Sequence, residues 1–318
     1  MNMVTIMGKN KLLVVYNICG FSRREPVDWY IDCLNNILNQ DFEDYRLVVS
    51  SCGNSMATIK KLVSTFGNKI SYNFINDRIT VNRSFNHTVR ECVQKFGEFE
   101  GYMYIDSGIN FRDDNTVLQQ AYDLYKSDNY GMVTIQASND NGFKEWFDMD
   151  GFVEGEDFVI PVGGACNLHT QIFSNEIFKA FDNKIIPDIF VAYCTESVFS
   201  FLSAAVNQRW VIKKDLILEH LKSIDGATCG FDHTGPKGDN KNNLFGGLDI
   251  YKICKDPEAY ASGFGYEEMQ GVLHHNKEAY NEDGTAKYPD RLREFIRTRM
   301  FLDNGHFDYS KVVNKFVK

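Results

Sequence analysis

Short apolar runs alternate with segments in which apolar residues recur every three or four positions through the first half of the chain. Runs of the first kind are typical of buried parallel strands, and segments of the second kind are typical of amphipathic helices. The pattern predicts strands at 11–17, 45–51, 69–76, 101–106 and 131–136. Between them it predicts helices at 26–40, 56–66, 82–96 and 115–126.

Several residues at the ends of these helices support the assignment. Pro26 suits a first helical turn, and Ser55 and Asn82 are residues that cap helices. Gly67 follows the second helix and is suited to ending it. Strands that alternate with helices in this way predict an α/β fold, with a mostly parallel nucleotide-binding sheet flanked by helices on both faces.

The second half is less regular. Residues 157–174 predict a strand, a Gly-rich turn and a second strand, and residues 175–181 predict a short helix. A helix over 196–208 and a strand over 209–220 follow. Because 225–247 has the composition of a loop and 248–318 is polar and helical in pattern, we predict one main domain over 1–225. Residues 226–318 would form a loop and a C-terminal extension that packs on or beside it.

Composition limits the class of protein. The chain has 318 residues, of which 43% are apolar and 24% are charged, as in ordinary soluble globular proteins. A net charge of −9 argues against a surface that coats nucleic acid or an anionic membrane as a whole. It leaves a local basic patch open.

The cysteines and the N-terminal segment bear on localisation. None of the eight cysteines forms a CxxC pair, so the spacing of a zinc site is absent. Cys33 and Cys92 lie in apolar runs, which favours reduced core residues over a disulfide framework. No stretch approaches the roughly 20 apolar residues of a membrane span, and residues 1–11 do not read as a signal peptide. We therefore predict a cytoplasmic protein without a membrane span; its oligomeric state is left open.

Three common motifs of nucleotide-binding and acyl-transfer enzymes are missing. The sequence has no GxxxxGK[ST] loop, no GxGxxG after the first strand and no GxSxG elbow. What the pattern offers instead is the stretch YMYIDSG, a predicted strand that ends in Asp106, Ser107 and Gly108. Ligands of open α/β sheets bind at the carboxyl ends of the strands, so Asp106 is a candidate ligand-binding residue. The alternative is an acid that caps the following turn through backbone N–H groups.

At this point the chain resembles sugar-nucleotide glycosyltransferases of the A-type (GT-A) fold, especially the large inverting family 2 type with cellulose-synthase and capsule-type members. The resemblance covers roughly residues 11–225 and lies in the order of short phrases. These are VVYNICGFSRREPVDWYIDCLNNILNQDFEDYRLVVSSCGNS, which contains ILNQDFEDY, then NDRITVNRSFNHTV, and then YIDSG where the family carries Asp-x-Asp. Its third position is Gly108, so only Asp106 supplies a carboxylate within that motif.

The resemblance implies a nucleoside-diphosphate sugar as donor and Mn²⁺ or Mg²⁺ as cofactor. A hard divalent cation neutralises the charge of the leaving diphosphate, and it needs only one or two protein ligands. Asp106 would be one of them, and the family's late histidine would be the other. His220 matches that position, with His233 as the rival; the alternative for His220 is a partly buried histidine with an ordinary hydrogen bond.

The resemblance also implies a catalytic base for an inverting transfer. The family keeps an acid at the start of a helix after its Gly-rich turn, and here YCTESVFSFL places Glu196 there. Ser197 stands where a second acid is usual. The alternative is that Glu196 only complements the helix dipole in a first turn.

Further residues would contact the donor. The backbone at Gly163 and Gly164 would come close to the donor sugar or the acceptor, because glycine has no side chain. A plain β-turn explains the same two glycines. Lys237 lies in a Gly-rich loop over 225–240 that would close over the diphosphate. The complete set of predicted donor-binding residues is Asn17, Ser51, Arg78, Asn82, Asn86, Asp106, Ser107, Gly164 and Lys237.

The hypothesis is therefore a metal-dependent glycosyltransferase that moves the sugar, with inversion, to a glycan, a lipid-linked glycan or another hydroxyl acceptor. Arg293 and Arg297, one helical turn apart, would suit an anionic acceptor, and a hydroxylated base of viral DNA is one alternative. A salt-bridged helix face explains the same arginines. The remaining alternatives are a nucleotidyltransferase and a non-catalytic module that binds sugar nucleotides or glycans.

Overall fold

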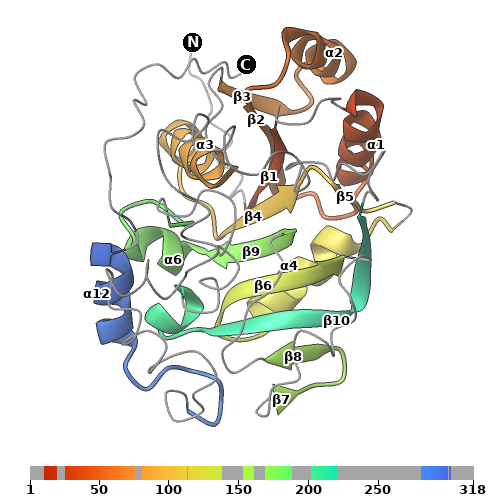
Figure 1. The fold of residues 1–318 in the computed structure, drawn as a ribbon. Helices are drawn as coiled ribbons and strands as arrows, with labels where there is room; N and C mark the ends of the chain where they lie inside the picture. The colour runs from red at the N-terminus through yellow and green to blue at the C-terminus, as the bar shows by residue number, and fades with distance from the viewer. Residues whose placement is uncertain are drawn as a thin grey trace, which may run out of the picture.

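A mixed sheet forms the centre of the molecule (Figure 1). The computed structural model describes residues 11–19, 26–75, 81–112, 114–137, 153–160, 169–187, 202–220, 281–299 and 301. The strands are β1 (Leu12–Cys19), β2 (Tyr45–Cys52), β3 (Ser71–Ile75), β4 (Gly101–Asp106), β5 (Ile109–Asn110), β6 (Tyr130–Ala137), β7 (Val153–Glu154), β8 (Phe158–Ile160), β9 (Thr170–Ser174) and β10 (Arg209–His220). The helices are α1 (Val27–Leu38), α2 (Met56–Phe66), α3 (Val81–Phe96), α4 (Val117–Ser127), α6 (Asn175–Ala180) and α12 (Pro289–Arg299).

The strand order is β3-β2-β1-β4-β9-β6-β10-β8-β7, and β5 pairs with the end of β10. The neighbours from β3 to β4 are parallel, and so are β6 and β10. Strand β9 runs antiparallel between β4 and β6, and β8 runs antiparallel to β10. The predicted α/β fold with a mostly parallel sheet is therefore confirmed. The two-residue strands β5 and β7 were not predicted, because so short a segment has no periodicity.

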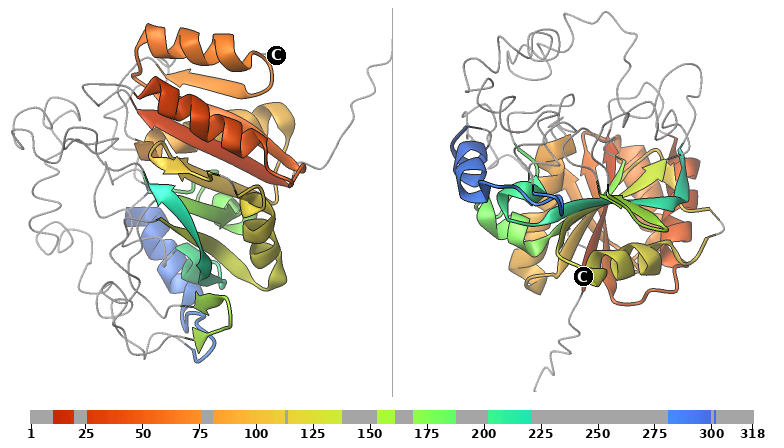
Figure 2. Two further views of the ribbon diagram at one scale, coloured as in Figure 1. Left: turned by 90° about the vertical axis from the view of Figure 1, so that its right-hand side faces the viewer. Right: turned by 90° about the horizontal axis from the view of Figure 1, so that it is seen from below.

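Helices cover both faces of this sheet, which Figure 2 shows in views along the layers. Alternate residues of β1 enter two separate cores: Leu12 and Val14 join one, while Leu13 and Val15 join the other. The first core contains side chains of α1, α2 and α4, and the second contains side chains of α3, α6 and α12. We call the two sides the α1 face and the α3 face.

The helix ends follow the local sequence, with one correction. The Ser55 side chain accepts a hydrogen bond from the Thr58 N–H at 3.2 Å, and Gly67 ends α2 with φ of 54°, so both predictions are confirmed. Helix α3 begins at Val81, so Asn82 lies inside its first turn and is not the cap. Helix α4 begins at Val117, because the Thr116 N–H and hydroxyl bond to Asp114 in a turn just before it.

Helix α12 lies in the predicted C-terminal extension. Its Leu292 and Ile296 are buried in the core of the α3 face. On its exposed side Arg293 pairs with Asp290, and Arg297 pairs with Glu294 at 3.0 Å. The salt-bridged explanation of these two arginines is therefore confirmed, and it removes the observation that favoured an anionic acceptor. The division at residue 225 stays a prediction.

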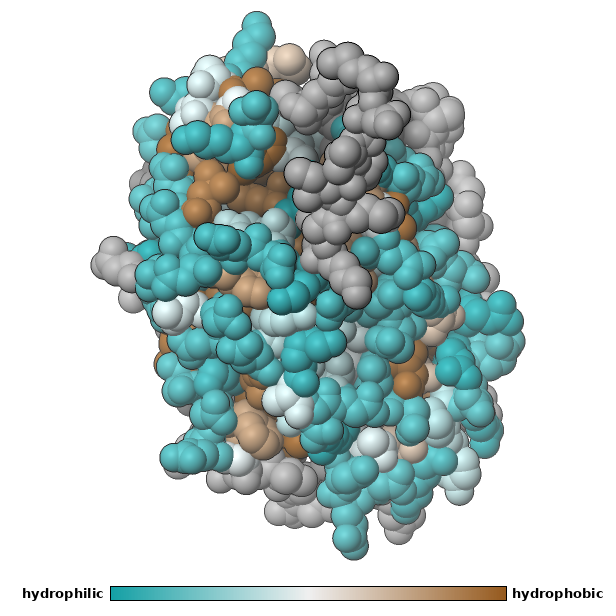
Figure 3. All heavy atoms as spheres, turned by 180° about the vertical axis from the view of Figure 1, so that it is seen from behind, coloured by the Kyte–Doolittle hydropathy of each residue, from teal (hydrophilic) through white to brown (hydrophobic). Residues whose placement is uncertain are grey.

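Two general expectations can be compared with the described residues. Cys33 and Cys92 are buried core residues, and neither belongs to a disulfide there. No helix in the described part of the chain has the length and apolar character of a membrane span. Figure 3 shows that the face behind the view of Figure 1 is mostly hydrophilic, with hydrophobic atoms in separate patches.

Candidate active site

Four polar residues form one line across the carboxyl ends of the parallel strands. Asn73 of β3 pairs in register with Ser50 of β2, Ser50 pairs with Asn17 of β1, and Asn17 pairs with Asp106 of β4. Asn17, Ser50 and Asp106 each lie two residues after a residue of the α3-face core, and the neighbours of Asn73 lie in the α1-face core, so the four side chains share the α3 face. We call these four residues the polar row. It lies at the edge of the sheet where open α/β proteins bind ligands.

Helix α3 covers the β3 and β2 end of the polar row with side chains that bond to it. Ser50 Oγ and Ser84 Oγ are 2.6 Å apart, and the Thr88 hydroxyl donates to Ser50 Oγ at 2.8 Å. The Asn73 amide donates to Thr88 Oγ1 at 2.7 Å. All four side chains are buried. Because buried hydroxyls and amides need partners, this network fixes the position of α3 over the row.

His87 extends the same network. Its Nδ1 lies 3.2 Å from the Asn73 amide nitrogen. Burial, and secondarily the charge of Arg90, lowers the pKa of His87 to about 4. The imidazole is therefore neutral at pH 7, which suits a ring nitrogen that accepts a hydrogen bond from Asn73.

Asn17 lies next to Asp106 and has an acceptor to spare. Its amide nitrogen donates to the carbonyls of Val15 at 3.1 Å and Ile105 at 3.4 Å. Its Oδ1 is buried, since the residue is only 5% exposed, and no described residue donates a hydrogen bond to this oxygen. A buried acceptor left without a donor costs about 1–3 kcal/mol. A ligand group that donates a hydrogen bond would recover that cost.

Asp106 is partly exposed at the end of β4, and its carboxylate is engaged on one side. Oδ1 accepts the Gly108 N–H at 2.8 Å and lies 3.4 Å from Ser107 Oγ. The turn-capping interpretation is therefore confirmed for this oxygen. A carboxylate has a second oxygen, and among the described residues no group bonds to Oδ2 and no Lys or Arg pairs with Asp106.

His220 approaches Asp106 from β10, a strand that is separated from β4 by β9 and β6. It is the last residue of β10 and pairs with Ile109 of β5, just after the turn. A Cβ on Gly108 would lie 2.9 Å from His220 Nε2 and 3.5 Å from Asp106 Oδ1. His220 Nε2 therefore packs closely against the backbone of Gly108, near Asp106, and this close approach is possible because residue 108 is glycine.

His169 lies close to both Asp106 and His220. Its carbonyl accepts the Asp106 N–H at 2.8 Å, and its ring centroid lies 4.5 Å from that of His220. His169 immediately precedes β9, the antiparallel strand next to β4. The inserted strand therefore brings a second imidazole beside Asp106.

The path of β10 toward this site is irregular and anchored. The register between β10 and β6 shifts between Lys213 and Ile217. Lys213 Nζ pairs with Asp157 at 2.7 Å and with Asp215 at 2.8 Å. Burial alone would lower the pKa of Lys213, but these two carboxylates outweigh it and raise the pKa. Bulges re-aim strands next to functional sites, and this one precedes the stretch that carries His220.

The donor set fits a divalent cation that is shared with a phosphorylated ligand. Among the residues the structure describes, no three His, Cys, Asp or Glu side chains form a complete metal site. Mg²⁺ and related ions in such sites bind one or two protein groups and take their other ligands from phosphates and water. The Asp106 carboxylate is the ligand type that Mg²⁺ and Mn²⁺ prefer, and the His220 imidazole would be a nitrogen ligand beside it.

Two other predicted residues lie elsewhere. Ser51 alternates with the row, so its side chain belongs to the α1 face, where it donates to Asn54 Oδ1 at 2.9 Å. Its neighbour Ser50 occupies the row instead. The Asn86 oxygen accepts the N–H groups of Ile185 and Ile186 at 3.0 and 3.1 Å. Asn86 therefore holds residues 185–186 against α3 and does not face the row.

The remaining predicted residues divide into two groups. Asn82 is 2% exposed in the first turn of α3, and Ser107 is 5% exposed in the turn after β4. Arg78, Gly164, Glu196 and Lys237, together with the rival His233, lie outside the described residues. Sequence reasoning missed Asn73, Ser50, His87 and His169. An asparagine in the middle of a buried strand, such as Asn73, was a usable signal, because asparagine is depleted in strands.

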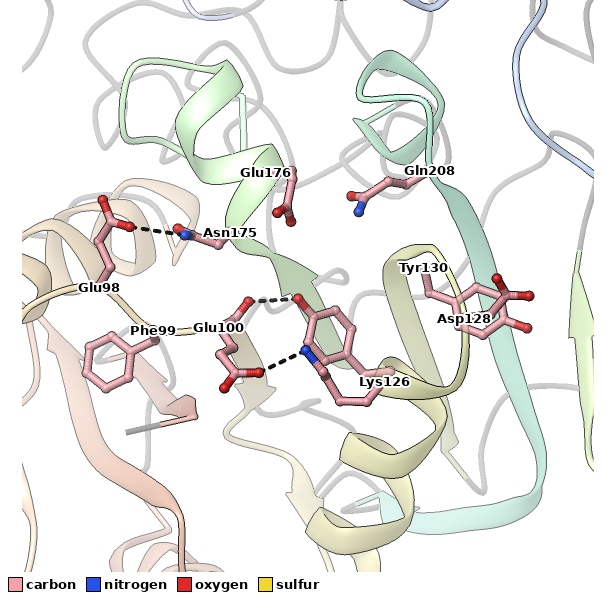
Figure 4. Close-up of a pocket in the computed structure, with 10 residues that line it drawn as sticks. Glu98, Phe99, Glu100, Lys126, Asp128, Tyr130, Asn175, Glu176 and Gln208 are labelled. Atoms are coloured by element: carbon pink, nitrogen blue, oxygen red, sulfur yellow. Dashed lines mark hydrogen bonds and ion pairs between the residues drawn. The ribbon is translucent and has the colours of Figure 1, made fainter. Parts of the chain in front are cut away.

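A second hollow lies at the opposite edge of the sheet, at the start of β4 (Figure 4). Its volume is about 670 Å³, and Glu98, Glu100, Asp128 and Glu176 line it. Glu98 pairs with Lys179 at 2.7 Å, Glu100 pairs with Lys126 at 2.9 Å, and Asp128 pairs with Arg209. Three of its four carboxylates are thus already neutralised by the protein. This edge is therefore a poorer candidate than the polar row.

Comparison with known proteins gives structural likenesses only. No family model and no curated protein sequence matches this chain. TarS 1–349 of S. aureus, solved with UDP-GlcNAc, has 14% identity and a TM-score of 0.48 over 76% of this chain and 66% of that one. Mannosyltransferase PcManGT of Pyrobaculum calidifontis, solved with GDP-Man and Mn²⁺, has 12% identity and a TM-score of 0.49 over 90% and 69%.

Another structure of TarS 1–349 matches 66% of this chain, and the match spans 60% of its own length. At this level of identity and superposition, these likenesses carry no conclusion about what this chain binds or catalyses. The function has to be argued from the residues at the carboxyl edge.

Proposed function

We propose that the chain is a metal-dependent glycosyltransferase that moves a sugar from a nucleoside-diphosphate sugar to a hydroxyl acceptor. The observation that carries the proposal is that Asp106 and His220 both lie next to Gly108, at the carboxyl end of β4. The resemblance of the sequence phrases to GT-A glycosyltransferases supports it independently. A bound Mn²⁺ or Mg²⁺ would supply positive charge to the leaving diphosphate.

The protein groups have separate tasks in this proposal. Asp106 would bind the cation through its second carboxylate oxygen, and His220, which lies next to Gly108, would add an imidazole ligand. Asn17 accepts a hydrogen bond from the ligand at its buried Oδ1. Glu196, on the sequence pattern alone, removes the proton of the acceptor hydroxyl in an inverting transfer. We propose a glycan or lipid-linked glycan as acceptor.

A thermal-shift panel tests this proposal first. UDP, GDP and their sugar conjugates are added with and without Mn²⁺, and a donor at 100 times its Kd should stabilise the protein by about 2.7 kcal/mol. For a chain of this size that corresponds to a rise in Tm of about 4 °C. The shift should require Mn²⁺ and disappear in Asp106→Asn.

An assay of donor hydrolysis and transfer then separates an enzyme from a binding module. Slow release of the nucleoside diphosphate from the stabilising donor is expected for the enzyme. Stabilisation without any hydrolysis or transfer would favour the non-catalytic module. A panel in which no nucleotide shifts the Tm with or without Mn²⁺ would contradict the proposal.

A further inference from the structure

The turn that carries Asp106 is held from the α1 face by two aromatic donors. The Trp29 indole N–H donates to the Ser107 carbonyl at 2.9 Å, and the Tyr16 hydroxyl donates to the same oxygen at 2.8 Å. A carbonyl oxygen has two lone pairs, so both are used. Trp29 comes from α1 and Tyr16 from β1. Two separate elements therefore fix one peptide group.

This carbonyl belongs to the Ser107–Gly108 peptide group, which lies between Asp106 and the part of the backbone that His220 packs against. The N–H of the same peptide group, which belongs to Gly108, donates to Asp106 Oδ1 at 2.8 Å. A rotation of the Ser107–Gly108 peptide would swing that N–H away from the carboxylate. It would also move the backbone of Gly108, against which His220 Nε2 lies. The two donors therefore restrict the motion that would spoil the site.

Both donors keep their role at every pH at which the protein is folded. Tyr16 is fully buried, and burial raises its pKa well above the ordinary value, so the phenol stays protonated. The indole N–H of Trp29 does not titrate.

Helix α1 holds the next residues of the same segment as well. The Asn110 amide nitrogen donates to Asp32 Oδ2 at 2.8 Å, and the Asn36 amide donates to Asn110 Oδ1 at 2.8 Å. Trp29, Asp32 and Asn36 are spaced at three and four residues, so they lie on one face of α1. One helix face thus contacts the turn and β5 together.

We propose that Trp29 and Tyr16 are positioning residues that hold the Asp106–Gly108 turn in the geometry that binds a divalent cation with a nucleoside diphosphate. This inference rests on the proposed function for its ligand. The hold on the turn itself is measurable without any ligand.

The variants are Trp29→Phe, Tyr16→Phe and the double variant, each of which removes a donor and keeps an aromatic ring. The matched controls are Trp210→Phe and Tyr125→Phe. Trp210 Nε1 donates to Thr134 Oγ1 at 2.9 Å, and the Tyr125 hydroxyl donates to the Glu100 carbonyl at 2.7 Å. The second control removes the same kind of bond at the other end of β4.

The first measurement is hydrogen exchange of the Gly108 amide without ligand. Each single variant should exchange about fivefold faster, which corresponds to the loss of one hydrogen bond of about 1 kcal/mol. The double variant should exchange faster by more than the product of the two, because the carbonyl then has no partner. The controls should leave this amide unchanged. An unchanged Gly108 amide in the double variant would overturn the inference.

The second measurement is calorimetric binding of UDP and GDP with and without Mn²⁺. Each single variant should weaken Mn²⁺-dependent binding about fivefold, the double variant more, and the controls not at all. Equal binding by wild type and by a double variant whose turn exchanges faster would overturn the positioning role. If the wild type binds neither nucleotide with Mn²⁺, the proposed function fails, and the exchange measurement still decides whether the donors hold the turn.

Discussion

Glu100 immediately precedes β4 and Asp106 is its last residue, so one strand presents an acid at each edge of the sheet. Glu100 accepts hydrogen bonds from Tyr122 at 2.8 Å and Lys126 at 2.9 Å. Burial alone would raise the pKa of Glu100, but Lys126 and Tyr122 outweigh it and lower the pKa. Asp106 instead accepts bonds from its own turn and borders Asn17 and His220.

The comparison shows that a hollow in the surface is not by itself evidence of a ligand-binding site. A hollow of about 670 Å³ lies at the Glu100 edge, where protein cations already pair with three of its carboxylates. At the Asp106 edge a carboxylate without a described cation lies beside a buried acceptor without a described donor. A bound cation and a hydrogen-bond donor of a ligand would satisfy these two groups, whereas the carboxylates in structural ion pairs already have their partners.

The largest contrast is expected from removing each acid in turn. Asp106→Asn keeps an oxygen that can accept the Gly108 N–H, so the fold should survive while the charge is lost. Transfer should fall about a thousandfold, because a cation contributes several kcal/mol to stabilising the leaving diphosphate. Glu100→Gln should leave the rate within about twofold. Equal rates of donor turnover in the two variants would remove the distinction between the edges.

Acid should affect the two edges in different pH ranges. The pKa of His87 is lowered to about 4 in the folded protein, against about 6.5 when unfolded, so its neutral form favours the folded state. This contribution, at most about 3 kcal/mol, is complete above pH 6.5 and is lost as the pH falls toward 4. The pKa values of Glu98, Glu100 and Asp128 are lowered, so their contributions are lost at still lower pH.

Urea unfolding at pH 7 and at pH 4.5 measures this difference. Wild type should lose stability between these values, and His87→Gln should lose clearly less of it. Glu100→Gln is the matched control, since it should keep the wild-type loss over this interval. A His87→Gln variant with the full wild-type pH dependence would show that the network under α3 is not the acid-sensitive element.

Adding one methyl group at each edge should produce a smaller contrast. In Gly108→Ala the new Cβ would lie 2.9 Å from His220 Nε2, so the imidazole must shift. Mn²⁺-dependent nucleotide affinity should fall about 10- to 100-fold, as it does when the shell of a metal site is disturbed. In Gly131→Ala the new Cβ would lie 3.0 Å from the Gln208 side chain and from Ser203 Cα. That variant should lose stability and keep its affinity, and a comparable loss of affinity in both would count against the site.

The smallest effect is expected for the ion pairs of the Glu100 edge. Lys126 and Glu100 are both substantially exposed, so Lys126→Met should cost less than about 1 kcal/mol of unfolding free energy. The cost should shrink further at high salt because exposed charges are screened. Unfolding of both proteins at low and high salt tests this, and a large salt-independent loss would mean that this edge is more than a structural surface.

Sequence patterns predicted the main strands well because each is a continuous apolar run. Strand β1 is apolar at every position from Leu12 to Tyr16, which predicts burial on both faces, and its residues do enter two cores in alternation. The patterns predicted Asp106 as a strand-end acid, and family resemblance selected His220. They chose Ser51 where the fold presents Ser50, because a strand position does not reveal its face until its register with β1 is known. Trp29 was not recognised as a site residue, because its position in α1 does not reveal that its indole reaches the turn after β4.

By itself the sequence determined which segments become strands and helices, that the sheet is mostly parallel, and that an acid ends its fourth strand, because these follow from local periodicity. Tertiary structure alone decided that residues 17, 50, 73 and 106 share one line, that His220 packs against Gly108 near Asp106, and that two aromatic donors hold the turn. Those relations join residues up to 114 positions apart in the chain, since 220 − 106 = 114, and only strand order, register and helix packing bring such residues together.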